Sequence, residues 1–126
     1  PACGTSRNVL AILRAAGETP VVIDYLKTGW TRPQLVALFA AAGLTAREAL
    51  RTTKSPAKEM GLMEPEVSEA QILDAMVAEP VLVNRPIVVT AQGTRLCRPS
   101  EVVLEIMERM PPESLTKEDG TPVHAR

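Results

Sequence analysis

A cysteine near the start of the chain, Cys3, is followed by Gly4, Thr5 and Ser6 and then by apolar residues at helical spacing. The N-terminal end of a helix carries partial positive charge and unpaired N–H groups, which favour a thiolate and attract oxyanions. A thiol with an ordinary pKa near ~8.5 becomes nucleophilic at neutral pH in that setting. The small residues leave these N–H groups uncovered, and the Ser6 hydroxyl has the reach to donate to the sulfur. The segment therefore predicts a reactive cysteine beside an anion pocket.

Two familiar cysteine motifs do not fit this segment. A dithiol pair needs a second cysteine three residues after Cys3, where Ser6 stands. A phosphatase-type loop needs an arginine six residues after the cysteine, where Val9 stands. Cys3 must therefore be resolved by a thiol from elsewhere. Ser6 is also compatible with a simple helix N-cap, and Cys97, in an apolar stretch without a cationic or glycine flank, is expected to be a buried, inert cysteine.

Composition excludes several classes of function. The 126 residues are enough for one domain, and we expect a single domain over 1–126. Aromatic residues make up 2% of the chain and its net charge is −1, so a stacking platform or broad basic surface for nucleic acid is not expected. We find no signal peptide and no apolar run of membrane-spanning length. Two cysteines indicate a cytoplasmic protein with reduced thiols, and His124, the single histidine, lacks partners for a metal site.

The apolar pattern predicts an α/β domain with a small mixed sheet flanked by helices, and with extra helices inserted between the second strand and a C-terminal hairpin. The chain lacks an initiator methionine, and because a redox helix of this kind normally follows a strand, we expect a first strand before Pro1. The predicted elements are a helix over 6–16, a buried strand over 21–23, a helix from the capping box at Thr31 to Gly43, a short helix from Thr45 that ends near Arg51, an irregular segment over 52–67, a helix from Ser68 to Pro80, a hairpin of 87–89 with 95–97, a helix from Pro99 to Met110, and a polar tail over 111–126 with little to bury.

Three segments in this order resemble the glutaredoxin-coupled arsenate reductases: residues 1–8 (PACGTSRN), 84–89 (NRPIVV) and 93–101 (GTRLCRPSE), with a further match at 117–120 (KEDG). The match runs from Pro1 to about Gly120, and three ordered motifs are far more specific than one. The resemblance implies a thioredoxin-like fold in which Pro86 is the characteristic cis-proline. It also implies a preceding strand with a histidine near its end, which this sequence does not contain.

The resemblance implies a reaction and a set of site residues. In this family the cysteine that corresponds to Cys3 attacks arsenate and forms a covalent adduct, after which glutathione attacks, glutaredoxin reduces the mixed disulfide and arsenite is released. Three arginines line the anion pocket, and they correspond to Arg51, Arg85 and Arg98. No tightly bound cofactor is implied, because glutathione acts as a co-substrate.

The residues themselves favour a function for these arginines. A guanidinium stays protonated and can hold two oxygens of an oxyanion at once. Arg85 and Arg98 stand beside prolines at the ends of predicted strands, whereas Arg51 has weaker support because a solvated helix end would favour a cation in any case. We interpret Arg7 and Arg95 as structural residues or as distant contributors to the positive potential.

Two other functions remain open. A non-enzymatic, redox-responsive regulator of the same fold would bind the transcription machinery, but such regulators typically carry a second cysteine where Ser6 stands and lack the full arginine set. A thiol enzyme with another oxyanion substrate would meet the same charges. We expect a monomer, since no exposed apolar helix face is evident.

Overall fold

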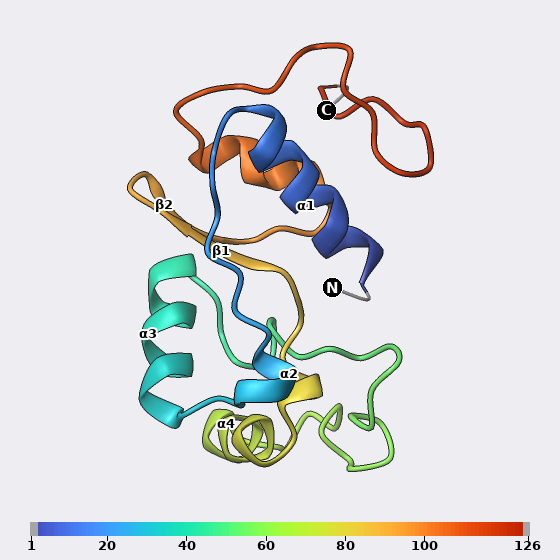
Figure 1. The fold of residues 1–126 in the computed structure, drawn as a ribbon. Helices are drawn as coiled ribbons and strands as arrows, with labels where there is room; N and C mark the ends of the chain where they lie inside the picture. The colour runs from blue at the N-terminus through green and yellow to red at the C-terminus, as the bar shows by residue number, and fades with distance from the viewer. Residues whose placement is uncertain (1–2, 125–126) are drawn as a thin grey trace. The chain divides into compact units, whose positions relative to one another are not determined.

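The structure is a computed structural model that describes residues 3–124, so that Pro1, Ala2 and the last two residues of the tail lie outside the described residues. The chain divides into two compact units, shown with the element labels in Figure 1. The first combines the segment up to Val22 with the segment from Arg85 onward, and the second is Ile23–Asn84. The assignment of 1–126 to a single domain stays a prediction.

The first unit consists of a helix, a hairpin and a 3-10 helix: α1 (Gly4–Ala15), β1 (Ile87–Thr90), β2 (Gly93–Leu96) and η2 (Ser100–Ile106). The two strands pair antiparallel, and the Thr90–Gly93 pair closes the hairpin. α1 packs against η2, and Figure 1 shows these as the blue and orange helices side by side. η2 also packs against β2.

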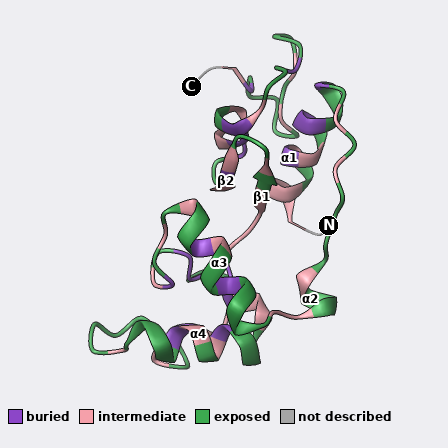
Figure 2. Ribbon diagram, turned by 90° about the vertical axis from the view of Figure 1, so that its left-hand side faces the viewer, coloured by how far each residue is buried: buried purple, intermediate pink, exposed green. Residues whose placement is uncertain are grey.

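The core of the first unit lies between these elements. α1 is amphipathic, and Figure 2 shows its buried positions in purple along one side of the helix. The core side chains are at most 7% exposed and come from α1, from the end of the hairpin, from η2 and from the tail: Val9, Ile12, Leu13, Cys97, Val103, Ile106 and Val123. Their packing joins α1, the hairpin, η2 and the tail in one core.

The second unit holds the remaining helices: α2 (Tyr25–Thr28), α3 (Arg32–Ala42), α4 (Glu69–Ala78) and the 3-10 helix η1 (Pro80–Leu82). The capping boxes predicted before α3 and α4 are both present. In each, the side-chain oxygen of Thr31 or Ser68 accepts the backbone N–H of the N3 glutamine, and the side chain of that glutamine accepts the backbone N–H of the capping residue. α3 ends at Gly43, which adopts the left-handed conformation at φ 70°.

The predicted buried strand over 21–23 is wrong. Val21 is 90% exposed and Ile23 is 70% exposed, and the segment is extended without a partner among the described residues. An unpaired strand leaves its N–H and C=O groups to water, so an apolar run alone does not make a strand. The described sheet accordingly has two antiparallel strands and is not mixed.

Two predicted helices are shorter or tighter than expected. The capping box between Thr45 and Glu48 forms, but it opens a single turn, because the chain then bridges Leu50 to Val83 in an antiparallel pair. The helix predicted from Pro99 to Met110 is the 3-10 helix η2, and it ends at Ile106. Met107 is already extended there.

The description of residues 111–126 as a polar tail with little to bury is also wrong. Val123 is 0% exposed within the core, and its N–H donates to the Leu115 carbonyl at 3.2 Å. Between them the chain turns back on itself through a bridge between Thr116 and Pro122. The prediction failed because one apolar residue in a polar segment carries no periodic signal. Within residues 3–124, no helix is long and apolar enough to span a membrane.

Candidate active site

The site is built around Cys3, which occupies the N-cap position of α1 with an extended backbone (φ −79°, ψ 124°). Its carbonyl accepts the Arg7 N–H at 3.0 Å, the first bond of the helix. Ser6 is therefore the third helical residue, so its interpretation as the N-cap is wrong. The Ser6 N–H at the start of the helix bonds to the Cys3 sulfur, as expected for a thiolate at a helix N-terminus.

The Cys3 thiol is set up to ionise near neutral pH. Partial burial by itself raises the pKa of Cys3. Hydrogen bonds from the backbone N–H and hydroxyl of Ser6, and then from Arg85 and Arg98, have the larger combined effect and lower the pKa to about 6. These donors all favour the charged form of the sulfur. At neutral pH most of the Cys3 side chains are consequently thiolate.

Arg98 and Arg85 come together with Cys3 within the first unit. One Arg98 nitrogen, Nη1, lies 3.8 Å from the Cys3 sulfur and also donates to the Arg85 carbonyl at 2.9 Å. The second bond anchors the Arg98 guanidinium on the segment that leads into β1. Both arginines thus face the thiolate with protonated donors, as an oxyanion pocket requires.

The flanking residues of the motif act less directly. The Thr5 carbonyl accepts from the Ser100 hydroxyl at 3.4 Å, which ties the start of α1 to the start of η2. A Cβ placed at Gly4 would meet Arg7 Nη2 at 3.6 Å, an ordinary contact, so space does not require the glycine. Direct support of the thiolate by Gly4 and Thr5 stays a prediction. The Arg85–Pro86 peptide bond is cis, at the position for which the family resemblance implies it.

Arg51 belongs to the second unit, and its role in the site stays a prediction. Its side chain is 6% exposed, not at a solvated helix end, and its Nε is buried without a hydrogen-bond partner among the described residues. The backbone around it is held firmly: the Arg51 N–H donates to the Leu82 carbonyl at 2.8 Å, and the Ser55 hydroxyl donates to the Arg51 carbonyl. A buried N–H donor without a hydrogen bond is costly unless a ligand accepts from it.

The residues interpreted as structural have other partners. Arg7 pairs with Glu118 through a 2.7 Å contact, and Arg95 pairs with Glu105 at 3.5 Å. Cys97 is 0% exposed, and burial raises its pKa to about 12, which suits an inert cysteine. Among residues 3–124 no group of histidine, cysteine and carboxylate side chains is arranged to hold a metal ion.

The sequence analysis missed the residues that tie the two helix starts of the site together, namely Ser100, Lys117 and Glu118. Within the sequence, Ser100 and the 117–120 segment stand out only through the family resemblance. The charged residues of that segment would fit an exposed turn equally well, so no pattern within the sequence assigns Lys117 and Glu118 to α1 and η2.

Comparison with known proteins agrees with this geometry. The sequence matches the ArsC family over residues 1–106. An arsenate reductase of Synechocystis sp. is 64% identical over 120 residues, which span 95% of this chain and 86% of the relative. The chain belongs to the ArsC family. The resemblance drawn from the three sequence motifs is thereby confirmed.

Other members extend the comparison. The arsenate reductase of Escherichia coli (strain K12) is 50% identical over 123 residues, covering 98% of this chain and 87% of that protein. The solved structure of an arsenate reductase from Vibrio cholerae superposes with a TM-score of 0.80 at 38% identity, covering 85% of this chain and 92% of the other. The predicted α/β, thioredoxin-like fold class is confirmed by these neighbours.

Proposed function

We propose that this ArsC-family protein is an arsenate reductase that uses Cys3 as its nucleophile. The observation that carries the proposal is the Cys3 sulfur, with a pKa lowered to about 6, facing the protonated donors of Arg98 and Arg85. The same donors that favour a thiolate favour an oxyanion beside it. The relatives named as arsenate reductases support the choice of arsenate among tetrahedral oxyanions.

The first chemical step is displacement at arsenic. The Cys3 thiolate attacks arsenate, a sulfur–arsenic bond forms, and one arsenic–oxygen bond breaks so that its oxygen leaves as water after protonation. Arg85 and Arg98 offset the negative charge that the thiolate and the arsenate bring together. Arg51 is proposed as the third oxyanion ligand, because its buried Nε has no partner among the described residues.

The second step reduces arsenic with a second thiol. Glutathione attacks the Cys3 sulfur and a disulfide bond forms, while the electron pair of the sulfur–arsenic bond passes to arsenic, which changes from As(V) to As(III). Arsenite leaves and Cys3 remains as a mixed disulfide with glutathione. Because Ser6 stands where a resolving cysteine would be, and Cys97 is buried with its pKa raised to about 12, the second thiol is proposed to come from outside the chain.

Glutaredoxin is the proposed reductant of this mixed disulfide, and no tightly bound cofactor is needed. The chemistry suits a monomer in a reducing compartment such as the cytoplasm, in a role of arsenic detoxification. Phosphorus does not accept electrons from thiols, so selectivity against phosphate is proposed to arise after attack, at the redox step.

The proposal is tested by arsenate-dependent NADPH oxidation with glutathione, glutaredoxin and glutathione reductase. The expected result is turnover that vanishes in Cys3→Ser, persists in Cys97→Ala and needs both glutathione and glutaredoxin. A folded protein whose Cys3 is alkylated rapidly but which shows no arsenate-dependent oxidation would contradict it. Turnover of phosphate esters by Cys3 would contradict the assigned selectivity.

A further inference from the structure

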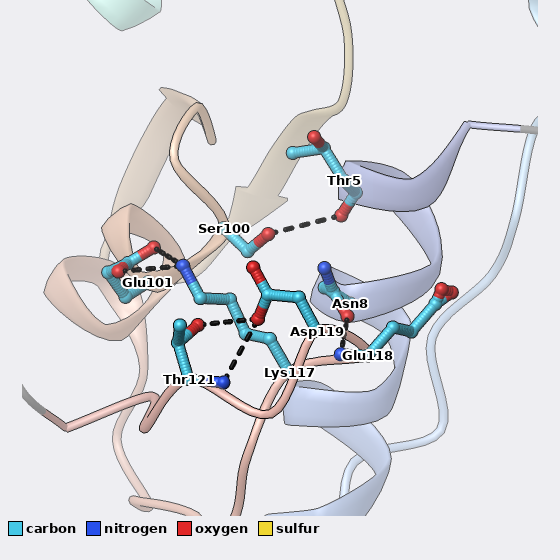
Figure 3. A network of polar contacts seen from close by, with 8 residues as sticks. All are labelled: Thr5, Asn8, Ser100, Glu101, Lys117, Glu118, Asp119 and Thr121. Atoms are coloured by element: carbon cyan, nitrogen blue, oxygen red, sulfur yellow. Dashed lines mark hydrogen bonds and ion pairs between the residues drawn. The ribbon is translucent and has the colours of Figure 1, made fainter.

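The tail of the chain forms a turn that contacts both helix starts of the site. We call residues 115–123 the C-terminal turn. It is closed by the Lys117 N–H donating to the Thr121 carbonyl at 2.8 Å, and Asp119 accepts from the Thr121 N–H at 3.0 Å and from its hydroxyl at 2.7 Å. Val123 anchors one end of the turn in the core. Figure 3 shows the turn between the first residues of α1 and those of η2.

One side of the turn is bonded to α1. The Glu118 carboxylate accepts from Arg7 Nε at 2.7 and 3.2 Å, and the Glu118 N–H donates to the Asn8 side-chain oxygen at 3.0 Å. Arg7 and Asn8 lie within the first five residues of α1, the helix that follows Cys3. A backbone bond and an ion pair therefore hold the end of α1 that carries the nucleophile.

The other side of the turn is bonded to η2. Lys117 Nζ contacts both carboxylate oxygens of Glu101 at 3.1 Å, and the two side chains are only 16% and 12% exposed. A pair this well covered is weakly screened by salt, and loss of one partner leaves a charge poorly solvated. Glu101 stands three residues after Arg98, whose guanidinium reaches the Cys3 sulfur.

We propose that the C-terminal turn is a positioning element of the active site, in which Lys117 and Glu118 set the distance between the Arg98 guanidinium and the Cys3 sulfur. The turn bridges the two segments that carry these groups. The Ser100–Thr5 bond is the direct tie between the same segments, and at 3.4 Å it is a weak hydrogen bond. Among the ties through the turn, the Lys117–Glu101 ion pair is well covered and is therefore the firmest, while the Arg7–Glu118 pair is half-exposed.

The readout is the pH midpoint of Cys3 alkylation by iodoacetamide, which reports the thiolate without arsenate. The groups that act on this thiolate are Ser6, Arg85 and Arg98, while the Cys3 charge also acts on Arg7. Glu118→Gln removes a negative charge, which by electrostatics alone would lower the pKa of Cys3. A rise in the midpoint would therefore report lost positioning and not lost charge.

The test compares three variants. The first variant is Glu118→Gln, and the second combines Glu101→Gln with Lys117→Gln and so keeps the net charge. Both are expected to raise the midpoint from about 6 toward about 7, because the distance from the Arg98 guanidinium to the Cys3 sulfur increases. Glu118→Asp keeps the negative charge, so its midpoint should lie between that of the wild type and that of Glu118→Gln. Glu18→Gln is the matched control: it removes an exposed ion pair to Arg109 at 3.2 Å, which ties the chain after α1 to the chain after η2, at the ends distant from Cys3.

Midpoints that stay at about 6 in folded Glu118→Gln protein would overturn the proposal, as would an equal rise in the Glu18→Gln control. If the double variant does not fold, Glu118→Gln decides the question, because it removes only the charge of one half-exposed ion pair. The inference rests on Cys3 as the nucleophile of the proposed function, but alkylation needs no arsenate. Failure of arsenate reduction with a shifted midpoint would reject the function and leave the positioning role intact.

Discussion

The hydroxyl of Ser6 should contribute a measurable part of the acidity of Cys3. Burial raises the pKa of this thiol, and the hydrogen bonds from the Ser6 N–H and hydroxyl, together with those from Arg85 and Arg98, outweigh that effect. A hydrogen bond to a charged group is worth roughly 1.5–3 kcal/mol, which corresponds to ~1–2 pKa units. Because Cys3 is only partly buried, solvent screening reduces this to about one unit.

Ser6→Ala should accordingly raise the pKa of Cys3 from about 6 to about 7. The pKa remains below the ordinary value of 9.0 because the Ser6 N–H, Arg85 and Arg98 are retained. At pH 6 the thiolate fraction then falls from about a half to about a tenth. Alanine is a good helix former at this position, so α1 should persist.

The assay follows the second-order rate of iodoacetamide alkylation from pH 4.5 to 10, with the thiolate absorbance as a second measure. The midpoint is the diagnostic quantity, since a more basic thiolate is also more nucleophilic and partly compensates the rate at any single pH. Ser6→Thr keeps a hydroxyl and should remain at about 6. Thr5→Ala should also remain there if Thr5 acts only through its backbone carbonyl. A Ser6→Ala midpoint still at about 6 would refute the reasoning.

Three further predictions concern stability and binding. Folding lowers the pKa of Cys3 from 9.0 to about 6, so between these pH values the unfolded chain binds more protons than the folded chain. The free energy of unfolding, taken as the difference between the wild type and Cys3→Ser, should therefore rise as the pH is raised from 6 to 9. A difference that does not change with pH in urea titrations would contradict this. Cys97→Ser should cost about 1–3 kcal/mol in the same titrations, because a hydroxyl enters the core, without moving the Cys3 midpoint; an unchanged stability would contradict the packing. Arg51→Met should leave thermal stability equal or higher, because a buried Nε without a hydrogen bond is removed, while the KM for arsenate rises at least about tenfold. A lower melting temperature with an unchanged KM would assign Arg51 a purely structural role.

The reactive cysteine at the N-terminus of α1 was predictable because the local signals agreed, although the helix begins at Gly4, two residues before the predicted start. The glycine-threonine-serine flank, the apolar spacing of the helix and the absent second cysteine all pointed to one reactive thiol at a helix N-terminus. The capping boxes of α3 and α4 were predictable for the same reason, since their hydrogen bonds lie within four residues of sequence.

Features that depend on distant segments were not predictable. The apolar run at 21–23 looks like a strand, but pairing is decided by a partner that the run itself does not specify. The C-terminal turn looks solvated because it contributes a single core side chain, Val123, and because its charges find partners about 110 residues away for Glu118 and 16 residues away for Lys117. The Arg98 contact with Cys3 likewise spans 95 residues and was expected only through the family resemblance.

In the proposed mechanism the Cys3 thiolate attacks arsenate, and arsenic then takes up two electrons as glutathione attacks the Cys3 sulfur and leaves it in a mixed disulfide. The most direct measurement is mass spectrometry of the protein after incubation with arsenate and glutathione, in the absence of glutaredoxin. The account predicts one glutathione adduct per chain, mapped to Cys3, that forms only when arsenate is present and is removed by adding glutaredoxin. An adduct that forms equally without arsenate, or that maps to Cys97, would contradict the account.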